Sequence, residues 1–266
     1  MSAATSTTCA RRVGEPRPPA VTAISQAYPD RVEVRGHDLT ADLMGRLSFT
    51  EYFHLLLTGS EPTEEQREFL DLMLVAIAEH GLMPSNVAAR MTLAADPESL
   101  QGAVAAGILG AGPLLLGTSE ECAKLLAAAL ADGRSAGEVA GELHAARRRV
   151  PGFGHPVHRP VDPRAERILE LADERGASGP NVAFARELRH AVAETWGMPL
   201  PMNVSMPIAA VLLDLGFPVA AVKSVPILAR TASLLAHLAE EQERPLGFTL
   251  ARAAEDAVRY EPDARA

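Results

Sequence analysis

Residues 150–166 read VPGFGHPVHRPVDPRAE, and this stretch is the most informative part of the sequence. It combines two glycines, two histidines and two arginines around a predicted helix start. Glycine permits positive φ angles and a close approach of the backbone to a ligand. Asp162 followed by Pro163 is typical of a helix N-cap with proline at the first helical position. The stretch is therefore predicted to be a binding loop that leads into a helix.

Two side chains in this loop can carry chemistry. His155 follows the second glycine, and Arg164 lies in the first turn of the predicted helix. A helix N-terminus with an arginine is a ready anion site, and a histidine beside a bound carbonyl can polarise it or move its proton. The alternative is a connector whose histidine and arginine merely cap neighbouring helices. His158 is predicted to be structural or solvent-facing.

Outward from this loop, the hydrophobic pattern predicts helices almost everywhere. Capping boxes are predicted at Ser48–Glu51 and Thr63–Gln66. Helices are expected within residues 48–57, 63–80, 86–95, 99–112, 119–133, 135–149, 163–172, 181–196, 206–216 and 224–241. Residues 32–34, VEV, are the one predicted strand, and no repeat of fixed period is present. The predicted fold class is all-α.

Composition restricts the function. The 266-residue chain has a net charge of −9, which argues against non-specific binding to nucleic acid or membranes because both are polyanionic. Two distant cysteines build no disulfide framework, and no phosphate loop, catalytic serine elbow or metal-ligand motif occurs. No signal-like run or stretch of about 18 apolar residues appears, so we expect a cytoplasmic protein without a metal. Residues 1–20 are expected to be a disordered tail.

Two further places hold polar side chains beside apolar helix faces. His80 lies at a predicted helix C-terminus in AEHGLMPSN, where a histidine can serve simply as a cap. Arg230, Ser233 and His237 form a polar stripe on the helix of residues 224–241. Such a stripe is either solvated or lines a cleft.

Taken together, these segments resemble the citrate synthase superfamily, most closely its short citryl-CoA lyase-like branch. The resemblance spans roughly residues 30–260. Four landmarks occur in the family's order: FHLLLTGSEPT (53–63), AEHGLMPSN (78–86), VPGFGHPVHRPVDPRAE (150–166) and the pair PMNVSMPIAAVLLDLGF…ILARTASLLAHLAEE within 201–241. The glycine-histidine loop is the most specific of them.

The resemblance implies a two-domain helical subunit that forms a homodimer or a dimer of dimers. We expect the large domain to comprise residues 21–114 and 215–266, and the small domain residues 115–214. The family makes or breaks the bond between the α-carbon of a CoA thioester and the carbonyl carbon of an oxo-acid. The expected partners are therefore small acyl-CoA and carboxylate substrates, with no tightly bound cofactor.

Residue roles follow from the same motif match. His80 would bind carboxylates, and His155 would polarise the carbonyl or carbinol oxygen. Arg164, Arg230 and, from the partner subunit, Arg259 would bind carboxylates. The backbone of the CoA loop, which comprises Val150, Pro151, Gly152, Phe153 and Gly154, would lie against CoA.

Two positions depart from the family's pattern. The family's enolising aspartate lies in an N-V-D motif, whereas this chain reads Asn203-Val204-Ser205. A family histidine in a G-P-x-H-G loop corresponds to Leu115. A serine hydroxyl is no general base near neutral pH without a partner, although Ser205 can also be interpreted as a helix N-cap. Asp214, nine residues further on, is predicted to be too distant to substitute for the aspartate.

Three functions therefore remain open from the sequence. The first is a lyase for citryl-CoA or a related 3-hydroxy-acyl-CoA. The second is the same scaffold used for other acyl-thioester chemistry, such as decarboxylation, dehydration or a pathway-specific aldol step. The third is a non-catalytic binder of acyl-CoA or carboxylates.

Overall fold

The computed structural model describes residues 20–262, apart from the side chains of residues 113–115. The predicted tail, but for residue 20, and the Leu115 side chain lie outside the described residues. Contacts divide the chain into two compact units, Met1–Ser48 and Phe49–Ala266. The domain boundaries expected at residues 115 and 214 stay a prediction.

The described part of the first unit is a small antiparallel sheet. Its strands are β1 (Ser25–Ala27), β2 (Val32–Val34) and β3 (His37–Asp38), followed by a one-turn π-helix, Leu39–Leu43. The predicted strand at residues 32–34 is confirmed, whereas its two neighbours were not predicted. Arg35 and Gly36 both have positive φ and form the tight turn that joins β2 to β3.

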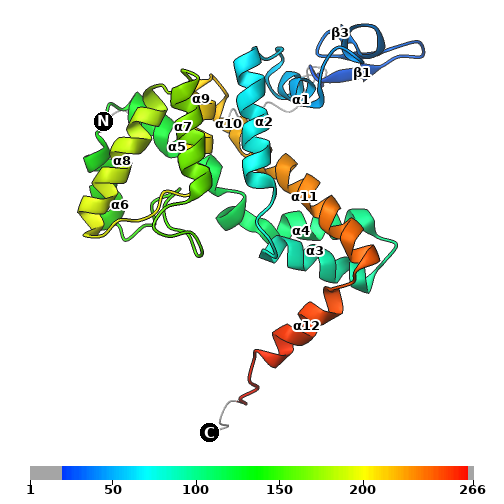
Figure 1. Cartoon of the computed structure of the whole chain (residues 1–266). Coiled ribbons are helices and arrows are strands. Elements are labelled where there is room, and N and C mark those ends of the chain that lie inside the picture. The colour runs from blue at the N-terminus through cyan, green and yellow to red at the C-terminus, as the bar shows by residue number, and fades with distance from the viewer. Residues whose placement is uncertain (1–19, 263–266) are drawn as a thin grey trace, which may run out of the picture. The chain divides into compact units, whose positions relative to one another are not determined.

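The second unit is helical, as predicted (Figure 1). Its helices are α1 (Phe49–Thr58), α2 (Glu64–Ala78), α3 (Pro84–Ala95), α4 (Leu100–Leu115), α5 (Thr118–Ala131), α6 (Ala136–Ala145), α7 (Pro163–Glu174), α8 (Pro180–Trp196), α9 (Ser205–Asp214), α10 (Val219–Val222), α11 (Ser224–Glu243) and α12 (Gly247–Asp256).

Local capping sets two helix ends that matter for the site. Thr63 and Gln66 form the predicted capping box of α2, and Asp162 caps α7 with Pro163 in its first turn. Helix α2 ends at Ala78, and its C-cap residue Glu79 is already extended. His80 therefore lies beyond the helix, in the connection to α3, and not within a helical C-terminus.

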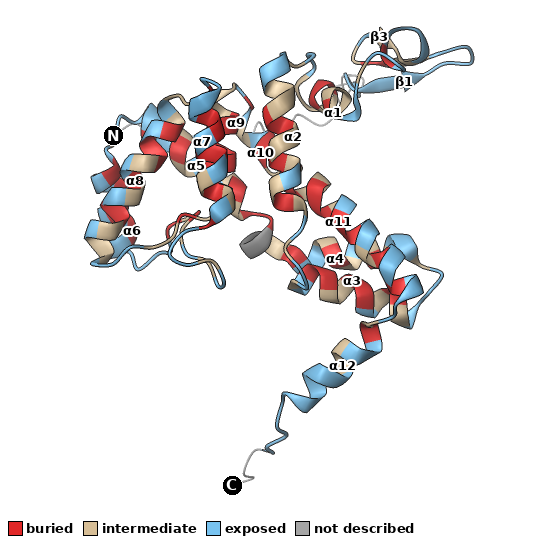
Figure 2. Ribbon diagram, in the orientation of Figure 1, coloured by how far each residue is buried: buried red, intermediate tan, exposed pale blue. Residues whose placement is uncertain are grey.

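The apolar interior has two parts, and α11 takes part in both. The main cluster gathers buried side chains from α2 and from α5 through α9, and it reaches the start of α11 at Val225 and Ala229. A smaller cluster, between α3, α4 and α11, includes Leu234 and Leu238 of α11. Figure 2 shows these buried stripes along α11 and its neighbours. Arg230 lies where α11 passes from one cluster to the other.

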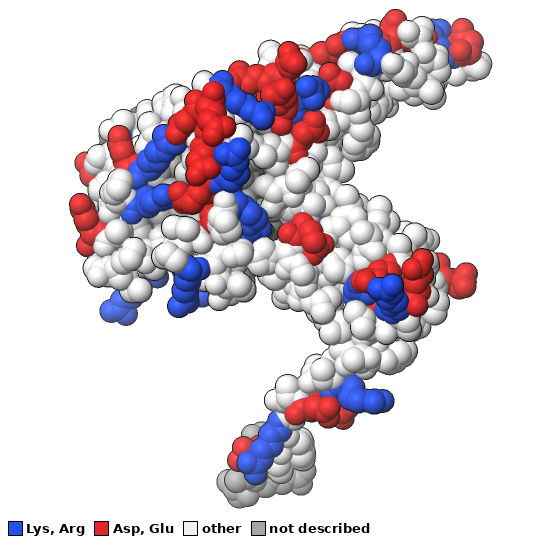
Figure 3. All heavy atoms as spheres, in the orientation of Figure 1, with Lys and Arg blue, Asp and Glu red and all other residues white. Residues whose placement is uncertain are grey.

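One segment, Val219–Glu243, is long and apolar enough to span a membrane by length and composition alone. In this fold it comprises α10 and α11, and α11 packs on α2, α3 and α4 as a core helix. Acidic and basic side chains are interspersed on the face seen in Figure 3 and are not gathered into one basic surface.

Candidate active site

The glycine-histidine loop is held against the segment that leads into α9. Phe153 forms an antiparallel bridge with Met202. The Gly154 N–H donates to the Pro201 carbonyl at 2.8 Å, and the Asn203 N–H donates to the Gly152 carbonyl at 2.8 Å. These backbone hydrogen bonds pair residues 152–154 of the loop with residues 201–203, in the manner of two short antiparallel strands.

Gly152 is required at its position for two reasons. Its φ is +78°, a conformation that disfavours any residue with a Cβ. A Cβ there would lie 2.7 Å from Met206 Cβ and 2.8 Å from Cys122 Sγ, both on fully buried residues. The loop therefore packs directly on α9 and α5.

Asp162 organises the start of α7. Its carboxylate is fully buried, and it accepts from the Arg164 N–H at 3.1 Å, from Arg164 Nε at 3.0 Å and from the Val204 N–H at 3.2 Å. Burial would raise its pKa, but the hydrogen bonds and charge of Arg164 lower it below the ordinary value. Asp162 thus stays ionised and aims the Arg164 guanidinium.

His155 is fixed in one tautomer by its own loop. Its Nδ1 accepts the backbone N–H groups of Val157, at 3.1 Å, and His158, at 2.9 Å. Nδ1 therefore carries no proton, and the neutral ring carries its proton on Nε2. Burial, together with the neighbouring His158, lowers the pKa of His155. The ring is a neutral hydrogen-bond donor.

Glu79 holds the backbone around His80. Its Oε1 accepts the N–H groups of His80, at 2.8 Å, and Gly81, at 2.6 Å. Its Oε2 accepts from the Ser233 hydroxyl and from His237 Nε2 of α11. Burial would raise the pKa of Glu79, yet these donors lower it to about 2.

Arg230 is a buried cation without a carboxylate partner among the described residues. Its guanidinium makes long hydrogen bonds, 3.4 Å to Asn86 Oδ1 and 3.5 Å to the Ile77 carbonyl. Burial lowers its pKa from the usual value. The buried Asn86 Nδ2 beside it also has no hydrogen-bond partner among the described residues. A buried guanidinium and an unpaired amide donor together favour a bound anion.

These elements meet at one cavity of about 170 Å³. The described residues that line it are Ile77, His80, Met83, Leu116, Thr118, Gly154, His155, Pro156, Arg164, Asn203, Val204, Ser205 and Arg230. Five predicted site residues, up to 150 positions apart in the sequence, therefore line the same cavity: His80, His155, Arg164, Ser205 and Arg230. None of these lining residues is acidic, and the two arginines make the cavity suitable for carboxylates.

Ser205 lines the cavity, but it is not the helix cap that the sequence allowed. It is the first residue of α9, and Val204 takes the N-cap position without any side-chain cap. Its N–H donates to Asn203 Oδ1 at 3.1 Å, whereas its hydroxyl makes no hydrogen bond to a described residue. The prediction that Asp214 lies elsewhere holds, because that carboxylate accepts the N–H groups of Gly179 and Val182 at the start of α8.

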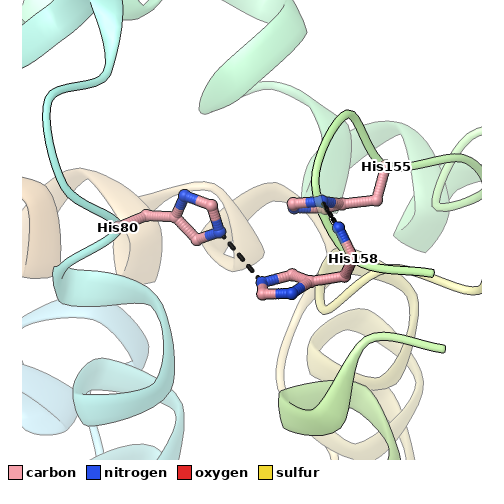
Figure 4. Close-up of side chains that lie close together, drawn as sticks. All are labelled: His80, His155 and His158. Carbon is pink, nitrogen blue, oxygen red and sulfur yellow. Dashed lines mark hydrogen bonds between the residues drawn. The ribbon is translucent and has the colours of Figure 1, made fainter.

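Three histidines place nitrogen atoms within 4.8 Å of one another: His80, His155 and His158 (Figure 4). Such a set could in principle hold a divalent transition metal. Ligation through His155 Nε2 would move the ring proton to Nδ1, where it would meet two backbone N–H donors. Arg164 and Arg230 add positive charge to the same cavity. The donor set therefore fits a hydrogen-bonding role better than a metal.

The remaining predicted residues lie around this cavity or away from it. Within the predicted CoA loop, Gly154 lines it, and Val150 and Phe153 line a second cavity of about 400 Å³. That second cavity also holds Trp196, His144, Leu200 and the run Arg147–Arg149, which we did not single out from the sequence. Arg259 is exposed beyond α12 and does not line the cavity of its own chain.

Sequence reasoning missed the supporting residues. Glu79 and Asn86 flank His80 in the AEHGLMPSN segment, and Asp162 was interpreted only as a cap. The polar stripe of α11 is not solvated, since Arg230 and Ser233 are buried against the α2–α3 connection. A buried stripe of this kind could have been suspected from the apolar residues on both of its sides.

Fold and site together define a helical protein with a cavity lined by histidine and arginine side chains. The family model for the C-terminal domain of citrate synthase matches residues 18–252. The chain belongs to the citrate synthase family.

Individual relatives refine this placement. The solved citryl-CoA lyase of Hydrogenobacter thermophilus is 30% identical with a TM-score of 0.84, covering 93% of this chain and 96% of that one. The citrate synthase of Synechocystis sp. is 30% identical over 202 residues, which are 74% of this chain and 50% of that protein. ATP citrate lyase of Methanosaeta concilii, solved with (3S)-citryl-CoA, shares the fold at 20% identity and a TM-score of 0.79, covering 93% of this chain and 43% of that one. The chain spans about half the length of the curated relatives it matches.

Proposed function

We propose that this protein breaks, or forms, the carbon–carbon bond between the α-carbon of a CoA thioester and an oxo-acid, in the manner of a citryl-CoA lyase. One observation carries the proposal. The buried Arg230, which has no carboxylate partner among the described residues, shares a cavity with Arg164 and with the fixed N–H donor of His155. A citryl group offers carboxylates to the arginines and a carbinol oxygen to the histidine.

The geometry supports a division of roles. A preorganised donor acts best where negative charge develops during the reaction. When the carbinol carbon becomes a carbonyl, the charge passes through its oxygen, which the Nε2–H of His155 can stabilise. Arg164, held by Asp162, and Arg230, held by Asn86, would orient the carboxylates. None of these groups needs to change its protonation state to bind the substrate.

The second cavity supports a CoA thioester as the substrate. It lies on the loop residues Val150 and Phe153 and presents the three arginines of the run Arg147–Arg149. Phosphate groups pair well with clustered guanidinium groups, and Trp196 offers an aromatic face to a nucleobase. We propose that the nucleotide part of CoA lies there.

Helix α12 supports a homodimer. It packs on α3, but Gly247 is its one buried residue. Phe248 is 73% exposed, and beyond the helix Val258 is 74% and Tyr260 86% exposed. Exposed apolar residues grouped on one helix and the residues that follow it indicate a protein–protein contact. We propose that a second copy of this chain covers them and that Arg259 reaches the partner's site.

A second candidate is favoured by one specific finding, the lack of an acidic side chain among the described residues that line the cavity. Family chemistry that removes a proton from the thioester's α-carbon uses an aspartate where this chain has Ser205. A substrate whose reaction needs no such proton removal, as in a decarboxylation or the cleavage direction of another aldol step, would suit the same cavity.

The test is a citryl-CoA cleavage assay on the purified full-length chain, with the oxo-acid product and acetyl-CoA quantified by mass spectrometry. We expect turnover that falls by about 10²–10⁴-fold in His155→Ala, the usual contribution of a positioned acid–base group. Ser205→Asp is the informative second variant, because a gain in activity would show that the rest of the site is intact.

Other outcomes would select among the alternatives. No turnover of citryl-CoA, but turnover of another acyl-CoA in a substrate panel, would establish the second candidate. Thermal stabilisation by CoA thioesters without any turnover would identify a binding protein. A folded protein that neither binds nor cleaves CoA thioesters would refute the proposal.

A further inference from the structure

Arg90 of α3 is a buried cation that does not line the cavity. It is 1% exposed, and α3 packs on both α11 and α12 (Figure 1). Its guanidinium donates to Glu240 and, at 2.9 Å, to Oε2 of Glu241. Glu241 is also buried, and its Oε1 accepts the N–H groups of Leu246, at 2.8 Å, and Gly247, at 2.7 Å. Arg90 is thus anchored to the start of α12.

Arg90 makes a further contact, with a histidine of α11. Its Nε and Nη2 lie 3.1 Å and 2.8 Å from Nδ1 of His237. A guanidinium offers only donors, so Nδ1 of His237 must be the acceptor and carries no proton. The ring proton of His237 is therefore on Nε2, which lies 3.1 Å from Oε2 of Glu79. Arg90 fixes His237 in the form that donates to Glu79.

Glu79 extends this chain of hydrogen bonds to the cavity. Its Oε1 accepts the N–H groups of His80 and Gly81. The His80 ring donates to the carbonyl of its own residue, and its Nε2 lies 3.1 Å from Nε2 of His158 (Figure 4). The orientation of this ring therefore depends on the backbone that Glu79 holds. His158 was expected to be structural or solvent-facing, but it contacts a residue that lines the cavity.

Glu79 needs this support because half of its side chain is exposed. A half-exposed glutamate keeps much of its rotamer freedom unless several partners hold it. Its Oε2 also accepts from the Ser233 hydroxyl, so His237 is one of two side chains that fix this oxygen. Glu79 acts on a second cavity residue as well. Burial lowers the pKa of Arg230, and the negative charge of Glu79 opposes this lowering.

We propose that Arg90 and His237 are positioning residues of the active site, which hold Glu79 and through it set the place of His80 in the cavity. This inference rests on the proposed function, since the cavity would receive the substrate of that reaction. If the network served only to attach α12, the contacts of Arg90 with the two glutamates would suffice and His237 would have no effect on the substrate.

The first test compares His237→Leu and His237→Gln in citryl-CoA cleavage. Leucine removes both hydrogen bonds, whereas the glutamine amide keeps one donor and one acceptor. We expect KM to rise about tenfold with leucine, less than the roughly 10²-fold that a 1 Å misplacement can cost. We expect a smaller rise with glutamine. The effect should fall on KM rather than kcat, because His80 lines the cavity in the ground state and the transition state alike.

The matched control is Leu238→Ala. Leu238 is the next residue of α11 and is fully buried in the apolar cluster between α3, α4 and α11. Its truncation weakens the packing of the same helices without removing any hydrogen bond of the network. We expect a lower Tm with an unchanged KM. An equal rise of KM in Leu238→Ala and His237→Leu would show that general loosening of α11 is the cause, and would overturn the proposal.

The second test needs no turnover. Nitrogen-15 NMR of the free wild-type protein should show His237 protonated on Nε2 and unprotonated on Nδ1, and a proton on Nδ1 would refute the contact with Arg90. This measurement requires no variant, so the proposal is testable even if His237→Leu does not fold. The amide protons of His80 and Gly81 should exchange with solvent faster in His237→Leu than in the wild type or in Leu238→Ala.

The outcomes separate the two proposals. Turnover by the wild type with an unchanged KM in His237→Leu would overturn the positioning role and leave the proposed function standing, whether or not amide exchange changes. If the wild type shows no turnover, the proposed function fails, and amide exchange then decides whether His237 positions His80. Unchanged exchange in His237→Leu would refute that positioning.

Discussion

Gly152→Ala perturbs the loop at the point where it contacts the helical core. The new Cβ would lie 2.7 Å from Met206 Cβ and 2.8 Å from Cys122 Sγ, well inside the carbon–carbon contact distance of about 3.5–4.0 Å. Met206 Cβ belongs to the start of α9 and cannot rotate away. The residue would also keep a φ of +78°. Two separate costs therefore act at one site.

The conformational cost and the packing cost both lower the free energy of unfolding. The left-handed conformation costs a residue with a Cβ roughly 1–2 kcal/mol. Forcing an extra methyl group into a packed core costs about 1–3 kcal/mol. The free energy of unfolding should thus fall by about 2–5 kcal/mol, a large share of the roughly 5–15 kcal/mol of a typical protein.

Gly154→Ala is the matched control, because Gly154 has a φ of +84° and no atom within 4 Å of the position that a Cβ would take. It should lose only the conformational part, about 1–2 kcal/mol. The assay is urea unfolding at one fixed protein concentration, followed by Trp196 fluorescence and circular dichroism. We expect both midpoints to fall, that of Gly152→Ala further, with unchanged slopes. Equal midpoints for the two variants would refute the packing argument.

Three further outcomes are expected. Arg230→Met should raise KM for the citryl substrate by at least about tenfold while preserving the fold, since charge-assisted hydrogen bonds contribute about 1.5–3 kcal/mol; an unchanged KM would place the carboxylates elsewhere. Glu79 has a folded pKa of about 2, below its unfolded value, so its stabilising effect is present above about pH 5 and is lost as the pH falls toward 2. The Tm difference between wild type and Glu79→Gln should therefore shrink between pH 6 and 3, and a constant difference would contradict this. Phe248→Glu should weaken self-association in analytical ultracentrifugation, whereas an unchanged sedimentation profile would remove α12 from the interface.

The helical fold was predictable because its signals are local. The capping box of Thr63 and Gln66 and the Asp162–Pro163 start of α7 both depend on residues a few positions apart, and both are confirmed. The strands β1 and β3 were missed because they are two or three residues long, and β1 is exposed, so neither shows a hydrophobic pattern.

The site was predictable in part. The motif match selected the histidines and arginines that the structure brings to one cavity, although their roles stay predictions. It did not select Glu79, Asn86 or His158, since each acts through a partner that lies far away in the sequence. The Ser205 cap was a reasonable local interpretation, but the helix begins one residue earlier and its N-cap is apolar.

The sequence by itself determined which residues form helices, where two of these helices begin, and which loop can approach a ligand, because propensity, capping and glycine conformation are short-range properties. Tertiary structure alone decided that Arg230 is buried without a carboxylate partner among the described residues, and that His80 faces His158. These are properties of groups that meet across the α2–α3 connection, the loop before α7 and helix α11, where burial and hydrogen-bond partners, rather than residue type, set charge and reactivity.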